Sequence, residues 1–393
     1  MRTLRNLKKP TVLVLLGWNT PVAIRAIGRY ARQANWHVES RPIYTEEIPI
    51  GWKGDGLIIS DSPRAEMHRF LRRQVTRQPT VIYGSNNLGL PAPAVSEDNV
   101  AAGRLAARHF LERNHRHFAW VNAYCGRTAT ERRDGFIREL HAAGATCALL
   151  EFPSASPSAS GWKQRRQWLA QHLRQLKRPL ALFALDDQLA SDAITVCIEQ
   201  GWRVPEEISV VGVGNLEFAC ECSLVPLTSI DLGEEDVAWR TAEVLDDLMH
   251  NKPAPGSILL PPRGIIIRQS SDTLAVGHAG VQRALRFMKD NLERPIGTEH
   301  IAEAAGLSRQ ALYQFFREEL DCTPADQLLH FRLEQARRQL RESKDSAEKI
   351  ALACGFGTRR TFDRCFMRTH NMPASAWRQQ EKTAYPRLTG FTG

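Results

Sequence analysis

The stretch "IALACGFGTRRTFDRCFMRTH", Ile350 to His370, decides the fold of the last third of the chain. A short helical pattern leads to a turn at Gly355. Thr358, a hydroxyl residue suited to cap a helix N-terminus, then precedes a second helical pattern. Phe362 and Phe366 are four residues apart, so they lie on one face of that second helix and predict its buried side. The pattern therefore predicts two short helices joined by a tight turn.

The same pattern occurs about 50 residues earlier, in "IAEAAGLSRQALYQFF". Gly306 marks the turn, Ser308 is the N-cap candidate, and Leu312 and Phe316 form the apolar pair. Two copies are too few for a solenoid. They predict two helix-turn-helix units joined by a longer helix, with the first unit at about 298–319, the helix at about 325–341 and the second unit at about 347–369.

Polar residues lie opposite both apolar pairs. In a helix-turn-helix unit this face of the second helix enters the major groove of DNA. Arginine can bind guanine or hold a phosphate there, and glutamine matches adenine. Tyr313 suits either a thymine-methyl contact or simple solvation. A solvated basic face is the alternative for a single stretch, but repetition of the whole unit favours DNA. The predicted DNA-binding residues are Arg309, Gln310, Tyr313, Gln314, Arg359, Arg360, Asp363 and Arg364.

The charge distribution agrees with an anionic partner. Formal net charge is +9 over 393 residues. Residues 278–393 carry 19 Lys and Arg against 14 Asp and Glu, a net charge of +5, and residues 347–378 carry 6 against 2. The second predicted unit therefore lies in the most basic segment of its domain, which favours binding to nucleic acid.

The first 270 residues follow a different pattern, in which apolar runs bounded by turn residues alternate with amphipathic helical stretches. Such alternation predicts parallel sheets covered on both faces, and the length suggests two α/β lobes. The predicted helices cover 99–112, 132–143, 188–200 and 235–248. The six apolar runs are "TVLVLL", "GDGLIIS", "TVIYG", "HFAWVNA", "LALFAL" and "ISVVGVG".

Composition excludes several classes of protein. No apolar run approaches 18 residues, and the run Val12 to Leu16 is too short for a signal peptide, so no membrane segment or export is expected. The eight cysteines include no CxxC pair, which argues against structural zinc and fits a reducing cytoplasm. No motif for nucleophilic, metal or nucleotide chemistry is found. We therefore expect no enzyme activity, no cofactor and no metal.

These patterns predict a two-lobed α/β domain at 1–270 and an all-α domain with two helix-turn-helix units at 281–385. A linker at 271–280 joins them, and a tail covers 386–393.

The helical half resembles the DNA-binding domain of the AraC/XylS family. The resemblance rests on "IALACGFGTRRTFDRCFMRTHNMPASAWR", with its Gly-Phe turn, spaced phenylalanines and late proline. The first half resembles the sugar-sensing domain of the LacI/GalR family, itself similar to periplasmic sugar-binding proteins. That resemblance rests on "EDNVAAGRLAARHFLERNHRHFAWV", "TERRDGF", "LFALDDQLASDAITVCIEQGWRVPEEISVVGVGN" and "PLTSIDL".

The second resemblance implies a ligand site. Arg132 matches a ligand-binding arginine, and Asp186 matches a position that contacts sugar hydroxyls, although either residue could simply form a salt bridge. The family's ligand-binding aspartate after "VVGV" is replaced here by Gly214. Asn215, the next residue, is the candidate to bind the ligand in its place, although it could also have no such role. Trp18 lies just past the first strand, where α/β crevices bind ligands, and could stack on a pyranose or merely pack on the surface.

Together the resemblances imply a sequence-specific DNA-binding transcriptional regulator in the cytoplasm. It would activate a sugar-catabolism operon when a monosaccharide such as xylose binds. A sugar acid held by Arg132 and Arg133, another small metabolite, or action as a repressor are the alternatives. The implied partners are double-stranded promoter DNA, RNA polymerase and a second copy of the chain, paired through the α/β half.

Overall fold

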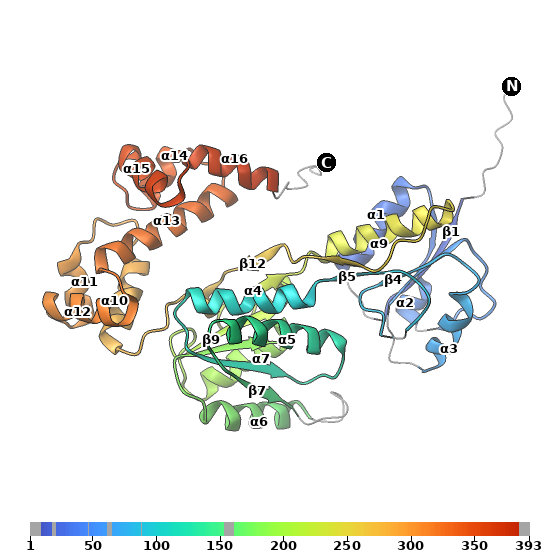
Figure 1. The fold of residues 1–393 in the computed structure, drawn as a ribbon, viewed down its shortest axis with the longest axis horizontal. Coiled ribbons are helices and arrows are strands. Elements are labelled where there is room, and N and C mark those ends of the chain that lie inside the picture. The colour runs from blue at the N-terminus through green and yellow to red at the C-terminus, as the bar shows by residue number, and fades with distance from the viewer. Residues whose placement is uncertain are drawn as a thin grey trace. The chain divides into compact units, whose positions relative to one another are not determined.

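The computed structural model describes residues 9–17, 21–45, 47–60, 65–87, 89–152 and 161–384. Trp18 and the predicted tail at 386–393 lie outside these residues. The chain divides into two compact units, one ending at Thr273 and the other beginning at Leu274. In the described residues the first unit contains two sheets, and the second contains helices only (Figure 1). No described helix is long and apolar enough to span a membrane.

The first sheet has the strand order β11-β5-β4-β3-β1-β2 and is parallel throughout. Successive residues of β1 face opposite cores: Val12 and Val14 pack with α1 and α9, whereas Leu13 and Leu15 pack toward α3. Burial on both faces explains why this strand is an unbroken apolar run. The elements of this lobe are β1 (Thr11–Leu15), α1 (Pro21–Gln33), β2 (His37–Glu39), α2 (Arg41–Thr45), β3 (Gly56–Ile59), α3 (Ala65–Gln74), β4 (Thr80–Tyr83), β5 (Ala94–Glu97), α9 (Glu234–Met249) and β11 (Ile258–Leu260).

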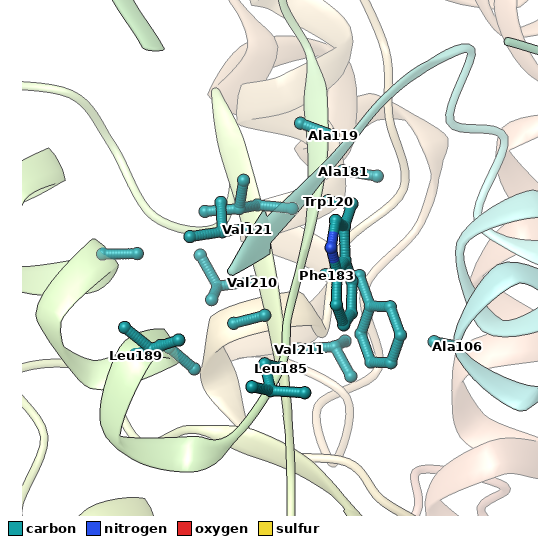
Figure 2. Close-up of a cluster of buried hydrophobic side chains, with 14 of the residues drawn as sticks. Ala106, Ala119, Trp120, Val121, Ala181, Phe183, Leu185, Leu189, Val210 and Val211 are labelled. Atoms are coloured by element: carbon teal, nitrogen blue, oxygen red, sulfur yellow. The ribbon is translucent and has the colours of Figure 1, made fainter. Parts of the chain in front are cut away.

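The second sheet has the order β12-β10-β9-β8-β6-β7, parallel except for β12 against β10. In its core the ring centroids of Trp120 and Phe183 are 5.2 Å apart, and Figure 2 shows the two rings side by side facing Ala106 of α4. The elements are α4 (Asn99–Glu112), β6 (His117–Asn122), α5 (Arg127–Ala142), β7 (Cys147–Glu151), α6 (Trp162–Arg174), β8 (Leu180–Ala184), α7 (Asp187–Glu199), β9 (Ile208–Val213), α8 (Glu217–Glu221), β10 (Thr228–Asp231), β12 (Gly264–Ile266) and the 3-10 helix η1 (Gln269–Ser271).

The helical unit has two small cores that share one long helix. Leu328 and Phe331 of α13 belong to the first core, and Leu333 and Leu340 of the same helix belong to the second. Figure 1 shows α10, α11 and α12 at one end of α13 and the later helices at the other. The bounds are α10 (Ala279–Asp290), α11 (Thr298–Ala305), α12 (Arg309–Leu320), α13 (Pro324–Glu342), α14 (Ala347–Ala353), α15 (Arg359–His370) and α16 (Ala374–Ala384).

The predicted fold class is confirmed: a two-sheet α/β unit precedes a helical unit with two helix-turn-helix arrangements. The predicted helix at 99–112 has the bounds of α4, and the one at 325–341 is extended by one residue at each end.

Candidate nucleic-acid interface and ligand site

The first helix-turn-helix unit consists of α11 and α12. The Ser308 hydroxyl accepts a hydrogen bond from the Ala311 N–H at 3.1 Å, so the predicted N-cap is confirmed. Leu312 and Phe316 are fully buried. This pair fixes which face of α12 is turned toward the protein and which is left outward.

The second unit consists of α14 and α15 and follows the same plan. The Thr358 hydroxyl accepts from the Thr361 N–H at 3.2 Å, which confirms the second predicted cap. Phe362 and Phe366 are fully buried, with ring centroids 5.4 Å apart. The outward face of α15 is therefore set by the same apolar spacing as that of α12.

The four outward residues of α12 carry little uncompensated charge. Arg309 and Gln310 are exposed, and Tyr313 is half-buried. Arg309 lies 3.8 Å from a carboxylate oxygen of Glu299. The side-chain amide of exposed Gln314 donates to Glu318 at 2.9 Å. This face offers mainly amide and hydroxyl groups to a partner.

The outward residues of α15 are all exposed and more basic. Arg359 pairs with Asp363 at 3.4 Å, whereas Arg360 and Arg364 have no ion-pair partner among the described residues. Two uncompensated guanidinium groups four positions apart on one helical face repel each other in the free protein. This repulsion is relieved when an anion or a guanine edge binds between or beside the two guanidinium groups.

In the α/β unit, the predicted ligand residues lie at the carboxyl ends of neighbouring strands. Asp186 follows β8 and caps α7, because its carboxylate accepts from the Leu189 N–H at 2.8 Å. Burial raises the pKa of this carboxyl group. The carboxyl edge of a parallel sheet is where ligands of α/β proteins bind.

Arg132 reaches the same edge from α5 and is 8% exposed. Its Nε donates to the Asn99 side-chain oxygen at 2.8 Å, and its Nη1 donates to the Leu185 carbonyl at 2.6 Å. Leu185 directly precedes Asp186, so the guanidinium lies beside that carboxylate. Burial lowers the pKa of Arg132. Its Nη2 has no hydrogen-bond partner among the described residues and remains available as a donor.

Asn215 follows β9, the strand next to β8, in a left-handed conformation with φ of 50°. Its N–H donates to the Ser229 hydroxyl at 2.9 Å, and its side-chain oxygen accepts from Arg268 Nη2 at 3.0 Å. Gly214 has φ of +123°, and a Cβ there would lie 3.4 Å from an Asp187 carboxylate oxygen. An aspartate at 214 would therefore be strained and placed next to a second buried carboxylate.

Two residues that organise this edge were not predicted from the sequence. Asp187 is fully buried and accepts from the Ser229 hydroxyl at 2.5 Å and the Leu216 N–H at 2.7 Å, and burial raises the pKa of its carboxyl group. Arg268 contacts Asn215 from 53 positions away in the chain. The paired aspartates in "LDD" could have drawn attention to the first, but no local signal marks the second. Among the described residues, no group of three or more His, Cys, Asp and Glu side chains could hold a metal ion.

Comparison with protein families assigns both halves. Residues 107–271 match the periplasmic binding protein-like domain, and residues 301–380 match a helix-turn-helix domain. With the geometry above, these matches define the class: the chain is a DNA-binding transcriptional regulator in which a periplasmic-binding-protein-like sensor precedes an AraC-type helix-turn-helix domain.

The chain is similar along most of its length to the xylose operon regulatory proteins. It is 26% identical to that of Escherichia coli strain K12, over 90% of this chain and 92% of the relative. It is 25% identical to that of Haemophilus influenzae, over 90% of this chain and 94% of the relative. The fold matches the solved structure of the xylose-binding transcription activator xylR, with a TM-score of 0.61, 24% identity, and coverage of 95% of this chain and 99% of the other.

Proposed function

We propose that the protein activates transcription of a sugar-catabolism operon when a monosaccharide such as xylose binds to its α/β unit. In this proposal residues up to about 270 form the sensor, 271–280 the linker and 281–385 the DNA-binding domain. The supporting observation is the position of three residues at one edge of the second sheet: Asp186 follows β8, Asn215 follows the neighbouring strand β9, and Arg132 donates to the Leu185 carbonyl at the end of β8. The similarity to xylose operon regulatory proteins supports the same ligand class.

The chemistry of this edge suits sugar hydroxyl groups. Arg132 has a donor left over, Asp186 supplies acceptors, and Asn215 supplies an amide, so donors and acceptors are presented together. Trp18, which follows the first strand in the sequence, is proposed as an apolar platform for the sugar ring. The two lobes would close over the sugar, and closure would favour the DNA-bound state of the protein. The size of this shift would equal the difference between the sugar's binding free energies for the open and closed states.

A neutral sugar is favoured over a sugar acid. The acid would require Arg132 and Arg133 to receive a carboxylate. Arg133 is already paired with Asp134 at 3.0 Å and Glu151 at 3.1 Å, so its charge is compensated within the protein. Arg132 lies beside Asp186, which neutralises part of its field.

On DNA, Arg360 and Arg364 are proposed to read guanine from the major groove, and Arg359 is proposed to contact both a base and a phosphate. Gln310 and Gln314 are proposed to read adenine, with Arg309, Tyr313 and Asp363 at the edges of the two contact surfaces. The protein would act as a cytoplasmic homodimer paired through its α/β units, would recruit RNA polymerase, and would carry out no catalysis. Sedimentation of the full chain at micromolar concentration tests the dimer, and a monomer would contradict it.

The ligand proposal is tested by thermal shift of the full chain with a panel of pentoses, hexoses, uronic acids, nucleosides and amino acids. A ligand present at 100 times its Kd should raise the free energy of unfolding of the protein by about 2.7 kcal/mol. Only a neutral sugar is expected to act. A shift with nucleosides or amino acids alone would contradict the sugar assignment.

The position of the site is tested with Asp186→Ser, which keeps a hydroxyl cap for α7 and removes the carboxylate. The sugar shift should be lost, whereas the control Asp134→Ala, which removes a carboxylate from α5, should keep it. An unchanged shift in Asp186→Ser would mean that the sugar binds elsewhere.

A further inference from the structure

Arg268, between β12 and η1, holds the edge of the sheet that carries Asn215. Its side chain is 15% exposed. Nε donates to a Glu221 carboxylate oxygen at 2.7 Å, Nη1 to the Leu227 carbonyl at 3.0 Å, and Nη2 to the Asn215 side-chain oxygen at 3.0 Å. Each nitrogen of the guanidinium therefore has an acceptor in a different part of the segment between β9 and β10: the loop after β9, helix α8 and the residue before β10.

The backbone of Arg268 is fixed as well. Its N–H donates to the Thr228 hydroxyl at 2.9 Å, and its carbonyl accepts from that hydroxyl at 2.9 Å. In η1 the Ser270 hydroxyl accepts from the Thr228 N–H at 2.8 Å and donates to the Val210 carbonyl at 2.7 Å. Because the backbone of Arg268 and η1 is hydrogen-bonded to β9 and β10, the guanidinium is held in one position and can fix the orientation of the Asn215 side chain.

The contact decides which way the Asn215 amide faces. Arginine has donors only, so it accepts nothing, and the Asn215 group that it meets must be the oxygen. The Asn215 NH2 group is then turned away from Arg268, and it has no hydrogen-bond partner among the described residues. A freely rotating asparagine could offer either end of its amide, but this one is held with its donors outward.

We propose that Arg268 is a positioning residue that makes Asn215 a hydrogen-bond donor to the effector. This inference rests on the proposed function, because it assigns a role at the same ligand site. The neighbouring position 214 carries no side chain that could supply an acceptor, so this part of the site recognises an acceptor oxygen of the sugar. An aspartate at position 214 would instead require a sugar hydroxyl that donates a hydrogen bond. Its replacement by glycine therefore changes which sugar groups this part of the site recognises.

Arginine is needed for this role rather than any cation. The planar guanidinium reaches three acceptors at fixed angles, whereas a lysine ammonium would keep the charge near Glu221 without fixing the amide plane. Arg268→Lys should therefore preserve the fold of the loop better than Arg268→Ala but lose the orientation of Asn215.

The first test needs no ligand. A double-mutant cycle with Arg268→Lys and Asn215→Ala is measured by the melting temperature of the full chain. The double variant should lose less than the sum of the single losses, because the two residues share one interaction. Additive losses would show that the contact does not hold the amide and would overturn the inference.

The second test uses deoxy and fluoro analogues of the sugar that stabilises the wild-type chain. Fluorine can accept a hydrogen bond but cannot donate one. At one hydroxyl position, the wild-type chain should tolerate fluorine within about threefold in Kd and lose about tenfold when the oxygen is removed, as for one hydrogen bond. In Asn215→Asp, fluorine at that position should be as damaging as removal.

One control variant and one test variant separate the outcomes. Arg203→Ala, which removes an arginine paired with Glu207 in the same lobe, should keep the wild-type pattern. Arg268→Lys should lose the distinction between fluoro and deoxy analogues while DNA affinity without sugar stays within about twofold. If the wild-type chain binds sugars but no position tolerates fluorine, the inference fails alone. If no sugar binds, the proposed function fails, and the melting cycle still decides the contact.

Discussion

The two helix-turn-helix units share one backbone plan at an offset of 50 residues, yet their outward faces differ. Gln310 and Gln314 in α12 correspond to Arg360 and Arg364 in α15. Gln314 is bonded to Glu318, whereas Arg364 has no ion-pair partner among the described residues. The same fold therefore presents neutral amides in one copy and uncompensated cations in the other. We expect the second unit to supply most of the salt-dependent affinity for DNA.

The turns of the two units also differ in how tightly they are enclosed. Gly306 and Gly355 both have positive φ, 64° and 74°. A Cβ at Gly306 would meet only the end of the Arg283 side chain, at 3.3 Å. A Cβ at Gly355 would lie 2.0 Å from the backbone oxygen of Leu292, which cannot move aside as a side chain can.

The largest expected effect follows from that difference. Gly306→Ala should cost about 1–2 kcal/mol for the left-handed backbone alone. Gly355→Ala should cost about 3 kcal/mol or more, because the backbone overlap adds to the same strain. Urea unfolding of the full chain, followed through the transition of the helical unit, measures both. Equal losses would show that the two turns are equivalent.

The second effect is on DNA recognition. Arg364→Ala should weaken binding to the specific site by about 1–3 kcal/mol and binding to random duplex only slightly. Gln314→Ala should cost about 1 kcal/mol or less, because the amide must first leave Glu318. Fluorescence anisotropy at fixed salt measures all four affinities. If Arg364→Ala weakens both duplexes equally, that residue holds phosphate and reads no base.

The smallest effect concerns pH. His370 ends α15 at the position where α12 has Leu320, and its buried Nε2 has no hydrogen-bond partner among the described residues. Burial and then the Arg337 charge lower its pKa below the ordinary 6.5. The unfolded chain therefore binds the proton more readily, and stability falls as pH drops below about 6.5.

His370→Leu should remove this part of the acid sensitivity of the helical unit. At pH 5.5 the His370→Leu chain should have a higher melting temperature than the wild-type chain. At pH 7.5 the difference between the two melting temperatures should be smaller. A constant difference across this range would show that the pKa of His370 is the same in the folded and unfolded chains.

The apolar runs predicted six inner strands, whereas the edge strands and the short inner strands β5 and β10 were not predicted from such runs. The six apolar runs became β1, β3, β4, β6, β8 and β9, which occupy inner positions of the two sheets. The strands at the edges, such as β2 and β7, are partly exposed and too short or mixed to stand out. Assignment of β11 and β12 to different sheets depends on contacts between distant segments, which local patterns do not contain.

The helix-turn-helix units were predictable to the residue level because their signals are local. N-caps, apolar pairs and glycine turns lie within a few positions of each other, as Thr358, Phe362 and Gly355 show. The ligand site at the edge of the second sheet was harder to predict from the sequence. Asp186 was suggested by resemblance, but the contact between Asn215 and Arg268 joins residues 53 positions apart and exists only in the folded chain.

Hydroxyl-radical footprinting of the full chain on its operator shows directly whether both helix-turn-helix units bind DNA. The 19 residues of α13 span about 28 Å, which suits two recognition helices held about one DNA turn, or 34 Å, apart. We predict two protected major-groove segments per protomer at that spacing, with Arg364→Ala weakening the protection of one and Gln314→Ala that of the other. Protection of a single groove segment per protomer would contradict this prediction.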